Sequence, residues 1–298
     1  MTTARVDTDV QTPSLWVMAM PGMFVALWST GFLGAKLGLP YAEPFTFLFF
    51  RFAILVVVLS AAAVAFRAPW PHTWTEVFHL SVVGVLVHGV YLGGVFSSIY
   101  AGLPAGVAAL VVGLQPVLTA IGAGLFLGER VSSRQWLGFL LGLVGVVLVL
   151  GEKLSFDTGD LHGVALAVSA LFGITIGTLY QKRHGHSMDL RSGSAVQFAA
   201  AAVPMAAMAM MFEARDVVWS GEFIFALGWL VVVLSLGAMT LLFLLIRRGA
   251  ASRVASLFYL VPPVTALFAW GLFGETLGVL AIVGMGVAVI GVALVTKG

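Results

Sequence analysis

The sequence predicts an all-α integral membrane protein with ten transmembrane helices in two inverted five-helix repeats. Three observations predict this fold class: the composition, the distribution of positive charge and an internal repeat. Of the 298 residues, 60% are hydrophobic and only 9% are charged, and the mean hydropathy is +1.07. Soluble domains carry about 25% charged residues, so soluble enzymes, nucleic-acid-binding proteins and disordered proteins are excluded. At roughly 21 residues per bilayer crossing, the apolar residues and glycines suffice for about ten helices.

Charged residues and prolines interrupt the apolar runs and divide the chain into ten candidate spans. The spans lie at residues 15–36, 44–66, 76–99, 104–127, 134–151, 161–181, 191–212, 223–246, 252–273 and 277–296. The runs are continuously apolar rather than alternating, which favours helices over the strands of a β-barrel. The first run is longer than the core of a signal peptide and no A-x-A pattern follows it, so we expect an uncleaved first helix.

Positive charges are distributed unequally between the two sides of these spans. Eleven lysines and arginines lie at the two termini and in the loops after even-numbered spans, whereas three lie in the loops on the opposite side. Cytoplasmic loops carry an excess of Lys and Arg. We therefore expect both termini to be cytoplasmic.

The internal repeat aligns residues 105–149 with residues 251–295 without a gap, at an offset of 146. Chance identities between two apolar segments are mostly Leu, Val and Ala, whereas this alignment also matches proline, threonine, glutamate and glycine. These identities include Pro116/Pro262, Thr119/Thr265, Gly128/Gly274, Glu129/Glu275, Gly138/Gly284 and Gly145/Gly291. We expect the glycines of the last span of each half to allow close helix packing.

An offset of about half the chain gives each repeat five spans. Because five is odd, the second repeat enters the membrane from the opposite side. We therefore divide the chain into a first repeat at residues 1–151 and an inverted second repeat at residues 152–298, which together form one compact membrane domain. Inverted pairs are typical of secondary transporters, and a duplication retained only for packing is the alternative.

The repeated segments resemble the EamA repeat of the drug/metabolite transporter superfamily. The first copy carries Ala109, Leu110, Pro116, Thr119, Ala120, Gly128, Glu129, Gly138 and Gly145, and the second carries Ala255, Pro262, Thr265, Ala266, Gly274, Glu275, Gly284 and Gly291. Two first-half signatures are similar as well: Trp28 and Ser29 with Lys36, and Pro44 with Arg51 and Phe52. The resemblance covers the whole chain, although no arginine repeats Arg51. Within the superfamily the sequence is most similar to YddG-type exporters of aromatic and other amino acids.

The resemblance implies a secondary transporter of the bacterial inner membrane that exports small organic solutes, mainly amino acids, by alternating access. Broader drug or metabolite efflux, with or without proton coupling, is the alternative, and a passive channel or an intramembrane enzyme is a weaker one. No HExxH, GxSxG, CxxC or phosphate-loop pattern is present and cysteine is absent, so we expect no enzyme activity, no cofactor and no metal. The expected partners are the solute and the lipid bilayer, not nucleic acid, and the oligomeric state is not predicted.

Polar and aromatic side chains inside the spans are the candidates for a substrate cavity, because polar groups in lipid are costly unless they are paired or face water. We expect the cavity to include Trp28, Ser29, His79, His88, Tyr91, Ser98, Gln115, Thr175, Ser235 and Tyr259. In a regular α-helix His88, Tyr91 and Ser98 share one face, and His79 lies nearer the cytoplasmic end. Hydrogen bonds between helices would explain these residues as well as substrate contact does.

A second group is expected to have structural or gating roles: Lys36, Arg51, Pro116, Glu129, Pro262 and Glu275. Lys36 is able to snorkel to a membrane face, which explains it as well as a cavity role does. Arg51 lies about 10 Å into its helix. We expect it to anchor the helix at the interface or to pair with a carboxylate such as Glu43, rather than to bind substrate.

The prolines and glutamates of this group are repeated pairs. Pro116 and Pro262 remove backbone hydrogen bonds in the middle of their spans and should interrupt both helices. Glu129 and Glu275 end spans four and nine at opposite membrane faces, where a carboxylate opposes the helix dipole unless it pairs with a neighbouring loop. Contacts that cap a neighbouring helix, or that form in only one conformation, are both consistent with this placement.

The ionisable side chain expected nearest the middle of a span is His88, which is able to remain neutral at pH 7. Both repeated carboxylates lie at helix ends rather than at the middle of the membrane. We therefore expect facilitated transport without proton coupling. The predicted cavity is aromatic, lined by hydroxyl groups and poor in fixed charge, which suits a zwitterion or a neutral amphiphile better than a sugar phosphate.

Overall fold

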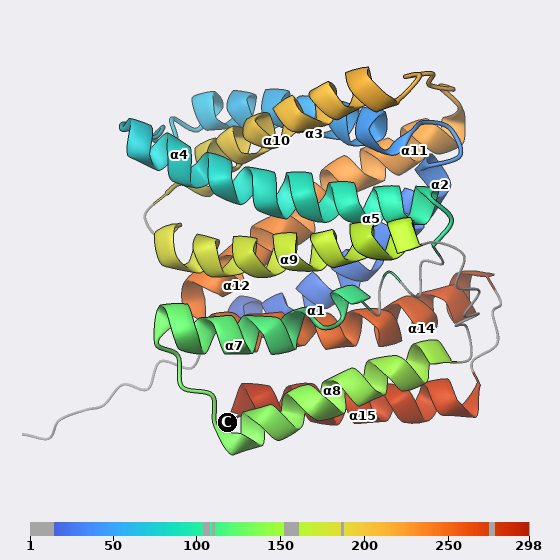
Figure 1. Cartoon of the computed structure of the whole chain (residues 1–298). Helices are drawn as coiled ribbons and strands as arrows, with labels where there is room; N and C mark the ends of the chain where they lie inside the picture. The colour runs from blue at the N-terminus through green and yellow to red at the C-terminus, as the bar shows by residue number, and fades with distance from the viewer. Residues whose placement is uncertain are drawn as a thin grey trace, which may run out of the picture.

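The computed structural model describes residues 15–103, 108, 111–151, 161–185, 188–273 and 278–297. Within these residues the protein is helical, and most helices run between the same two ends of one bundle (Figure 1). Six helices are long and apolar enough to cross a membrane by length and composition. This architecture confirms the predicted all-α membrane fold.

The first half contains α1 (Leu15–Ser29), α2 (Gly31–Gly38), α3 (Pro44–Ala65), α4 (Trp74–Val83), η1 (Gly84–Val90), α5 (Tyr91–Tyr100), α7 (Gln115–Leu127) and α8 (Ser133–Gly151). The second half contains α9 (Leu161–His184), α10 (Leu190–Phe212), α11 (Gly221–Trp229), η2 (Leu230–Ala238), α12 (Met239–Arg248), α13 (Ala251–Ser256), η3 (Leu257–Leu260), α14 (Val261–Phe273) and α15 (Val279–Lys297). Elements η1 and η2 are π-helical and continue the α-helices on either side, and η3 is a 3₁₀ turn. Joined end to end, the described elements form ten helical rods.

Helix boundaries in the second half repeat those in the first half at the offset of 146 residues. Both ends of α15 lie 146 residues after those of α8, and both ends of α14 lie 146 residues after those of α7. The wide π-helical segments also repeat, because η1 begins at Gly84 and η2 at Leu230. The structural repeat therefore extends to rods in which the sequence shows little identity.

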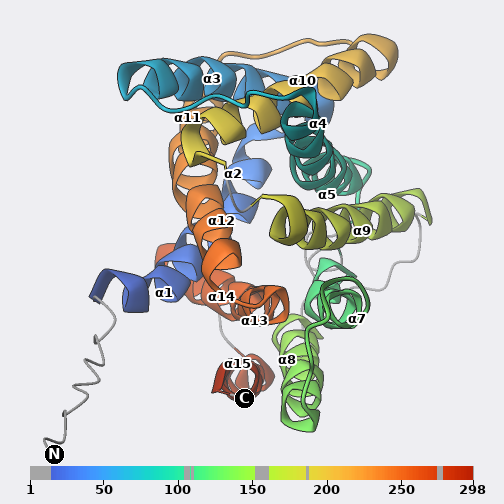
Figure 2. The same ribbon diagram turned by 90° about the vertical axis from the view of Figure 1, so that its left-hand side faces the viewer.

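Equivalent helices run in opposite directions. Glu213 follows the end of α10 and accepts hydrogen bonds from the backbone N–H groups of Phe45 and Thr46, at the start of α3, at 2.7 Å each. At the other end Ser192, near the start of α10, donates to the backbone oxygen of Pro69, beyond the end of α3. Helices α3 and α10 are therefore antiparallel, as an inverted repeat requires. They lie at one edge of the bundle, and α8 and α15 lie at the other (Figure 2).

Glycines bring α8 and α15 into backbone contact. A Cβ atom on Gly145 would lie 2.5 Å from the backbone nitrogen of Ala288, and one on Gly291 would lie 2.5 Å from that of Gly142. Such close approach is possible only for residues without a side chain, as in small-residue interfaces between membrane helices. The prediction that these glycines pack the last helix of each half is confirmed.

Two rods are interrupted at their prolines. Helix α7 begins one residue before Pro116, after a turn, and α14 begins one residue before Pro262, after η3. Proline has no backbone N–H and its ring clashes with the preceding turn, so a helix is readily broken there. Phe258, within η3, packs against the indole of Trp28 in T-shaped geometry at 5.1 Å between ring centroids.

The two ends of the bundle differ in charge. We call the end where α3 begins and α10 ends the acidic end, since it carries Glu43, Glu213, Asp216 and Glu222 together with Arg215. We call the opposite end the basic end, since its described residues include Arg67, Arg130, Arg134, Lys182, Arg183, Arg191, Arg247 and Arg248. The unequal charge found in the sequence is therefore a property of the two ends of one bundle.

Candidate functional site

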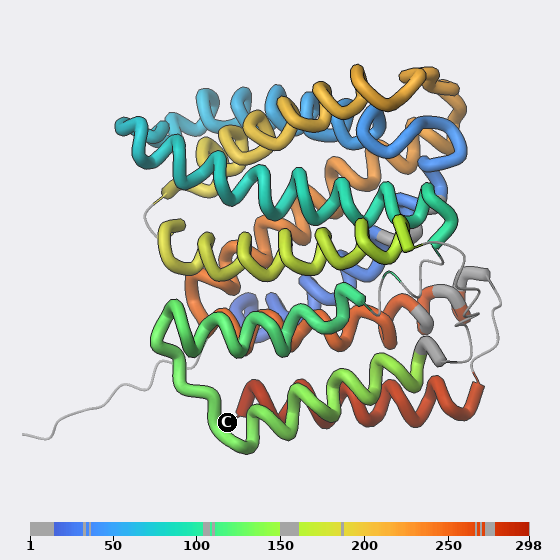
Figure 3. The backbone as a smooth tube through the Cα atoms, in the orientation of Figure 1, coloured from blue at the N-terminus to red at the C-terminus, as the bar shows by residue number. Residues whose placement is uncertain are grey.

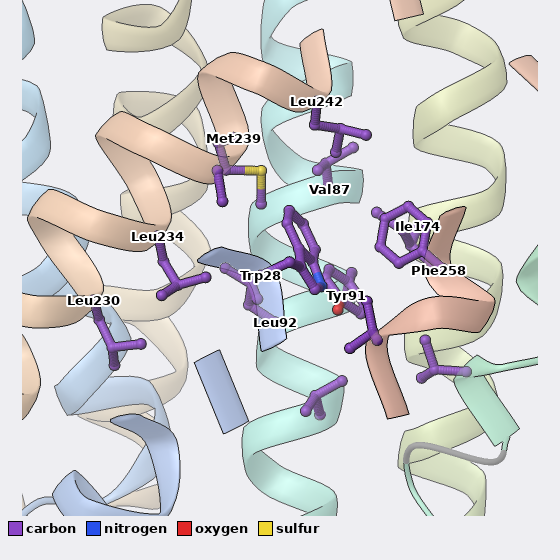
Figure 4. Close-up of a cluster of buried hydrophobic side chains, with 14 of the residues drawn as sticks. Trp28, Val87, Tyr91, Leu92, Ile174, Leu230, Leu234, Met239, Leu242 and Phe258 are labelled. Carbon is purple, nitrogen blue, oxygen red and sulfur yellow. The ribbon is translucent and has the colours of Figure 1, made fainter. Parts of the chain in front are cut away.

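A cavity lies between the two halves of the bundle, from its middle toward the acidic end. Its lining residues are Trp28, Gly31, Ala35, Arg51, Tyr91, Leu92, Val95, Phe96, Leu230, Leu234 and Met239. In Figure 4, Leu230, Leu234 and Met239 project from the η2–α12 ribbon on the side of Trp28 and Tyr91. Including its mouth, the space amounts to about 450 Å³. Small-molecule sites typically measure about 300–1,000 Å³, so the cavity is of a suitable size for a small solute.

Arg51 is the one charged side chain among the described residues that line the cavity, and it is only 2% exposed. Its Nε and Nη2 atoms donate to Ser235 Oγ at 3.1 and 2.8 Å. No carboxylate of the described residues forms an ion pair with it. Glu43, the carboxylate that we expected beside Arg51, accepts instead from the backbone N–H of Arg215. Burying an unpaired charge costs several kcal/mol, so this guanidinium is suited to an anion that enters the cavity.

Aromatic side chains form one wall of the cavity. The rings of Trp28 and Tyr91 are stacked, with centroids 6.4 Å apart and planes 15° apart. Behind Trp28, the rings of Phe24 and Phe258 pack at 5.2 and 5.1 Å. The cavity therefore combines one fixed positive charge with an aromatic wall and aliphatic side chains from η2. It is aromatic, as we predicted, but it contains a fixed charge that we did not place there.

The structure brings together three of the expected cavity residues: Trp28 and Tyr91 line the cavity, and Ser235 binds Arg51. Three hydroxyl groups instead bond to backbone oxygens: Ser29 to Val25 and Val261, Ser98 to Val95, and Thr175 to Leu171. Gln115 and Tyr259 are buried away from the cavity lining, and their polar side-chain atoms have no hydrogen-bond partner among the described residues.

His88 lies in η1 and is fully buried outside the cavity lining. Its ring stacks on Phe198 with centroids 4.0 Å apart. Neither ring nitrogen has a hydrogen-bond partner within the described part of the chain. The wider turns of a π-helix change which residues share a face, so the single stripe expected of His88 and Tyr91 does not form.

His79 lies near the basic end, where its Nδ1 atom and the Tyr180 hydroxyl are 2.6 Å apart. Its ring stacks on His184, with centroids 4.4 Å apart and planes 15° apart. We did not predict Tyr180 or His184 as partners, because both lie on α9, about a hundred residues along the chain. No local pattern in the sequence indicates this contact.

Glu129 joins two helices at the basic end. Its Oε1 atom accepts from the backbone N–H of Ala251 at 2.8 Å, and its Oε2 atom accepts from the Ser252 hydroxyl at 2.8 Å. The carboxylate that ends α7 thus caps the start of α13, where the helix dipole favours negative charge. Glu213 caps the start of α3 in the same way at the acidic end, and its position directly after α10 was a signal that we did not use. Glu275 and the side chain of Lys36 lie outside the described residues.

Comparison with known proteins extends the argument beyond the geometry. The family model described as the EamA-like transporter family matches residues 16–151 and 161–297. The chain is 27% identical over 273 residues to the uncharacterized inner membrane transporter YedA of Escherichia coli, covering 91% of this chain and 88% of the relative. It is 28% identical over 265 residues to a probable amino-acid metabolite efflux pump of Salmonella typhimurium, covering 86% of each.

One solved structure, described only as the crystal structure of a protein, superimposes with a TM-score of 0.77 at 23% identity. The match covers 93% of this chain and 95% of the other, which supports the fold. The two family matches each cover one five-rod half. The chain therefore belongs to the EamA-like transporter family, and it is a multi-pass membrane transporter rather than an enzyme.

Proposed function

We propose that the protein exports amino acids, including aromatic ones, by alternating access, as YddG-type exporters do. The observation that carries this proposal is Arg51, a buried guanidinium that lines the cavity without an ion-pair partner among the described residues. A guanidinium binds a carboxylate through two parallel hydrogen bonds. A solute carboxylate would supply the counter-charge that the described carboxylates of the protein do not.

The remaining lining suits the rest of an amino acid. Leu230 and Leu234 offer an aliphatic surface to an apolar side chain, and Trp28 and Tyr91 offer aromatic faces that attract an ammonium group. A sugar phosphate would require several cationic side chains, whereas the described lining contains only Arg51. The relative with a printed substrate class, the probable amino-acid metabolite efflux pump, agrees with this assignment.

The orientation in the membrane is part of the proposal. Loops rich in Lys and Arg remain on the cytoplasmic side. We place the basic end, and with it both termini, in the cytoplasm of a bacterial cell, so that the cavity lies toward the outer face of the inner membrane. A tag inserted at residues 153–160 should be accessible from the periplasm, and a tag found in the cytoplasm would contradict this orientation.

Flux measurements on purified protein in liposomes test the function. We expect saturable flux of labelled L-phenylalanine, L-tryptophan and L-leucine, which empty liposomes do not show. The proposed transport is downhill and requires no imposed proton gradient. Flux of a cationic dye without flux of any amino acid would refute the proposal and favour broader drug or metabolite efflux.

A further inference from the structure

The repeat gives each cavity residue a counterpart 146 residues away in the other half. Arg51 corresponds to Gln197, Ala35 to Gln181, and Leu234 to His88. All three counterparts are polar and buried, at 2%, 3% and 0% exposure. Each half therefore has buried polar side chains at cavity positions, but only the set with Arg51 lines the cavity described above.

The two sets lie on either side of a pair of equivalent residues. Phe52 and Phe198 are themselves counterparts, and their rings pack with centroids 5.6 Å apart. Arg51 precedes Phe52, and Gln197 precedes Phe198, against which His88 stacks. The pseudo-twofold axis of the repeat therefore passes between α3 and α10, with one polar set on each side.

The interface around the second set is closed. A Cβ atom on Gly173 of α9 would lie 2.9 Å from the backbone nitrogen of Tyr91. The counterparts of this pair are Leu27 and Gly237, and there the nearest atom to a Cβ on Gly237 is the end of the Leu27 side chain, at 3.1 Å. Helix α9 thus meets α5 at the backbone, whereas α1 meets η2 through side chains, beside the open cavity. The same interface is closed in one half and open in the other.

Closure leaves polar atoms in the second set without partners. Both ring nitrogens of His88 and Oε1 of Gln197 form no hydrogen bond with described residues. Gln197 Nε2 donates to Gln181 Oε1 at 3.3 Å, the one side-chain hydrogen bond found within the set. Buried polar groups normally have partners, so this concentration of unsatisfied atoms requires an explanation. A packing role does not supply one, since apolar residues would fill the same space at lower cost.

We infer that His88, Gln181 and Gln197 form the solute-binding site of the opposite conformation, in which α9 separates from η1 and α5. This inference rests on the proposed alternating access. In that conformation the two carboxamides and the imidazole would face the pathway toward the basic end. They offer hydrogen-bond donors and acceptors for the carboxylate and the ammonium group of a zwitterion. Because these groups lack the fixed charge of Arg51, the second site can exchange its solute without breaking an ion pair.

The absence of cysteine makes the inference testable with single cysteines. Gln197→Cys in inside-out vesicles is treated with a membrane-impermeant maleimide from the basic-end side. The same variant is then combined with Gly173→Ala, whose added Cβ would press on the backbone of α5 and favour separation of α9. Gly228→Ala is the matched control, because a Cβ there meets nothing within 4 Å.

We expect Gly173→Ala to accelerate labelling at position 197 by about tenfold, the lower range of what overpacking shifts an equilibrium by. Gly228→Ala should leave the rate unchanged, and a cysteine at the buried position Ala201 of α10 should stay unlabelled in both backgrounds. If Gln197→Cys does not fold, Gln181→Cys replaces it. Equal labelling rates in the Gly173→Ala and Gly228→Ala backgrounds would overturn the inference.

Protection from labelling tests the site as a binding site. L-Phenylalanine should slow labelling at position 197, with ethidium measured in parallel. Labelling does not depend on which solute is transported, so failure of amino-acid flux and failure of this inference are separate results. Labelling that is slowed by neither L-phenylalanine nor ethidium, when one of them is transported in liposomes, would overturn the inference.

Discussion

Replacement of Arg51 by glutamine removes the charge on which the proposed recognition of amino acids depends. Arginine has five N–H donors, and two hydrogen bonds from Arg51 go to Ser235, which leaves three N–H groups for a solute carboxylate. A hydrogen bond to a charged group contributes about 1.5–3 kcal/mol. The loss of one such bond corresponds to about a 10- to 100-fold increase in KM.

The assay compares two solutes that differ in the carboxylate. For L-phenylalanine, Arg51→Gln should raise the KM for flux in liposomes about 10- to 100-fold, and Arg51→Lys should fall between the wild type and Arg51→Gln because it retains the charge without the planar donors. For phenylethylamine, which lacks the carboxylate, Arg51→Gln should leave the KM unchanged or lower it. Arg134→Gln, at an exposed arginine of the basic end, is the matched control.

Stability and specificity separate the possible outcomes. Removing a buried unpaired charge need not destabilise a protein, so we expect Arg51→Gln to purify as a monodisperse protein with an unfolding temperature close to that of the wild type. Equal loss of L-phenylalanine and phenylethylamine transport would show that Arg51 supports the fold rather than the solute. Unchanged transport of both would refute its role in recognition altogether.

Three further predictions concern stability and coupling. Glu129→Gln removes the charge that caps α13 and should cost about 1–2 kcal/mol of stability, measured by thermal unfolding in detergent, whereas Glu76→Gln, which preserves a capping box, should change little; equal effects would contradict the assigned contact. Gly145→Val should destabilise the packing of α8 on α15 by about 1–3 kcal/mol or more, with Gly286→Val as a near-neutral control because a Cβ there meets nothing within 4 Å. A pH gradient should not drive accumulation of L-phenylalanine in wild-type or His88→Ala liposomes; accumulation in the wild type that His88→Ala abolishes would establish proton coupling.

The ten spans and the repeat could be predicted from the sequence because each depends on local composition. Long apolar runs must form helices in lipid, where every backbone group requires a partner. The repeated prolines Pro116 and Pro262 indicate where two rods are interrupted, because the missing N–H acts within one turn. Glycine spacing in the last span of each half likewise indicated the contact between α8 and α15.

The cavity was harder to predict because its chemistry depends on residues far apart in the chain. Arg51 and Ser235 are separated by 184 residues, and the sequence offered Glu43 as a nearer partner. The π-helical segments η1 and η2 have no common sequence signature, yet they decide that Tyr91 lines the cavity and that His88 does not. The composition of a span does not show where its turns widen.

The most direct test of the central claim is substrate protection at Leu234, which lines the Arg51 cavity. Leu234→Cys in the cysteine-free chain is labelled with an impermeant maleimide from the acidic-end side, and Val218→Cys, at an exposed position of the same end, serves as the control. The account predicts that L-phenylalanine slows labelling at position 234 but not at position 218, and that phenylethylamine protects less. Labelling at position 234 that is insensitive to L-phenylalanine, in protein that transports L-phenylalanine, would contradict the assignment of this cavity as the substrate site.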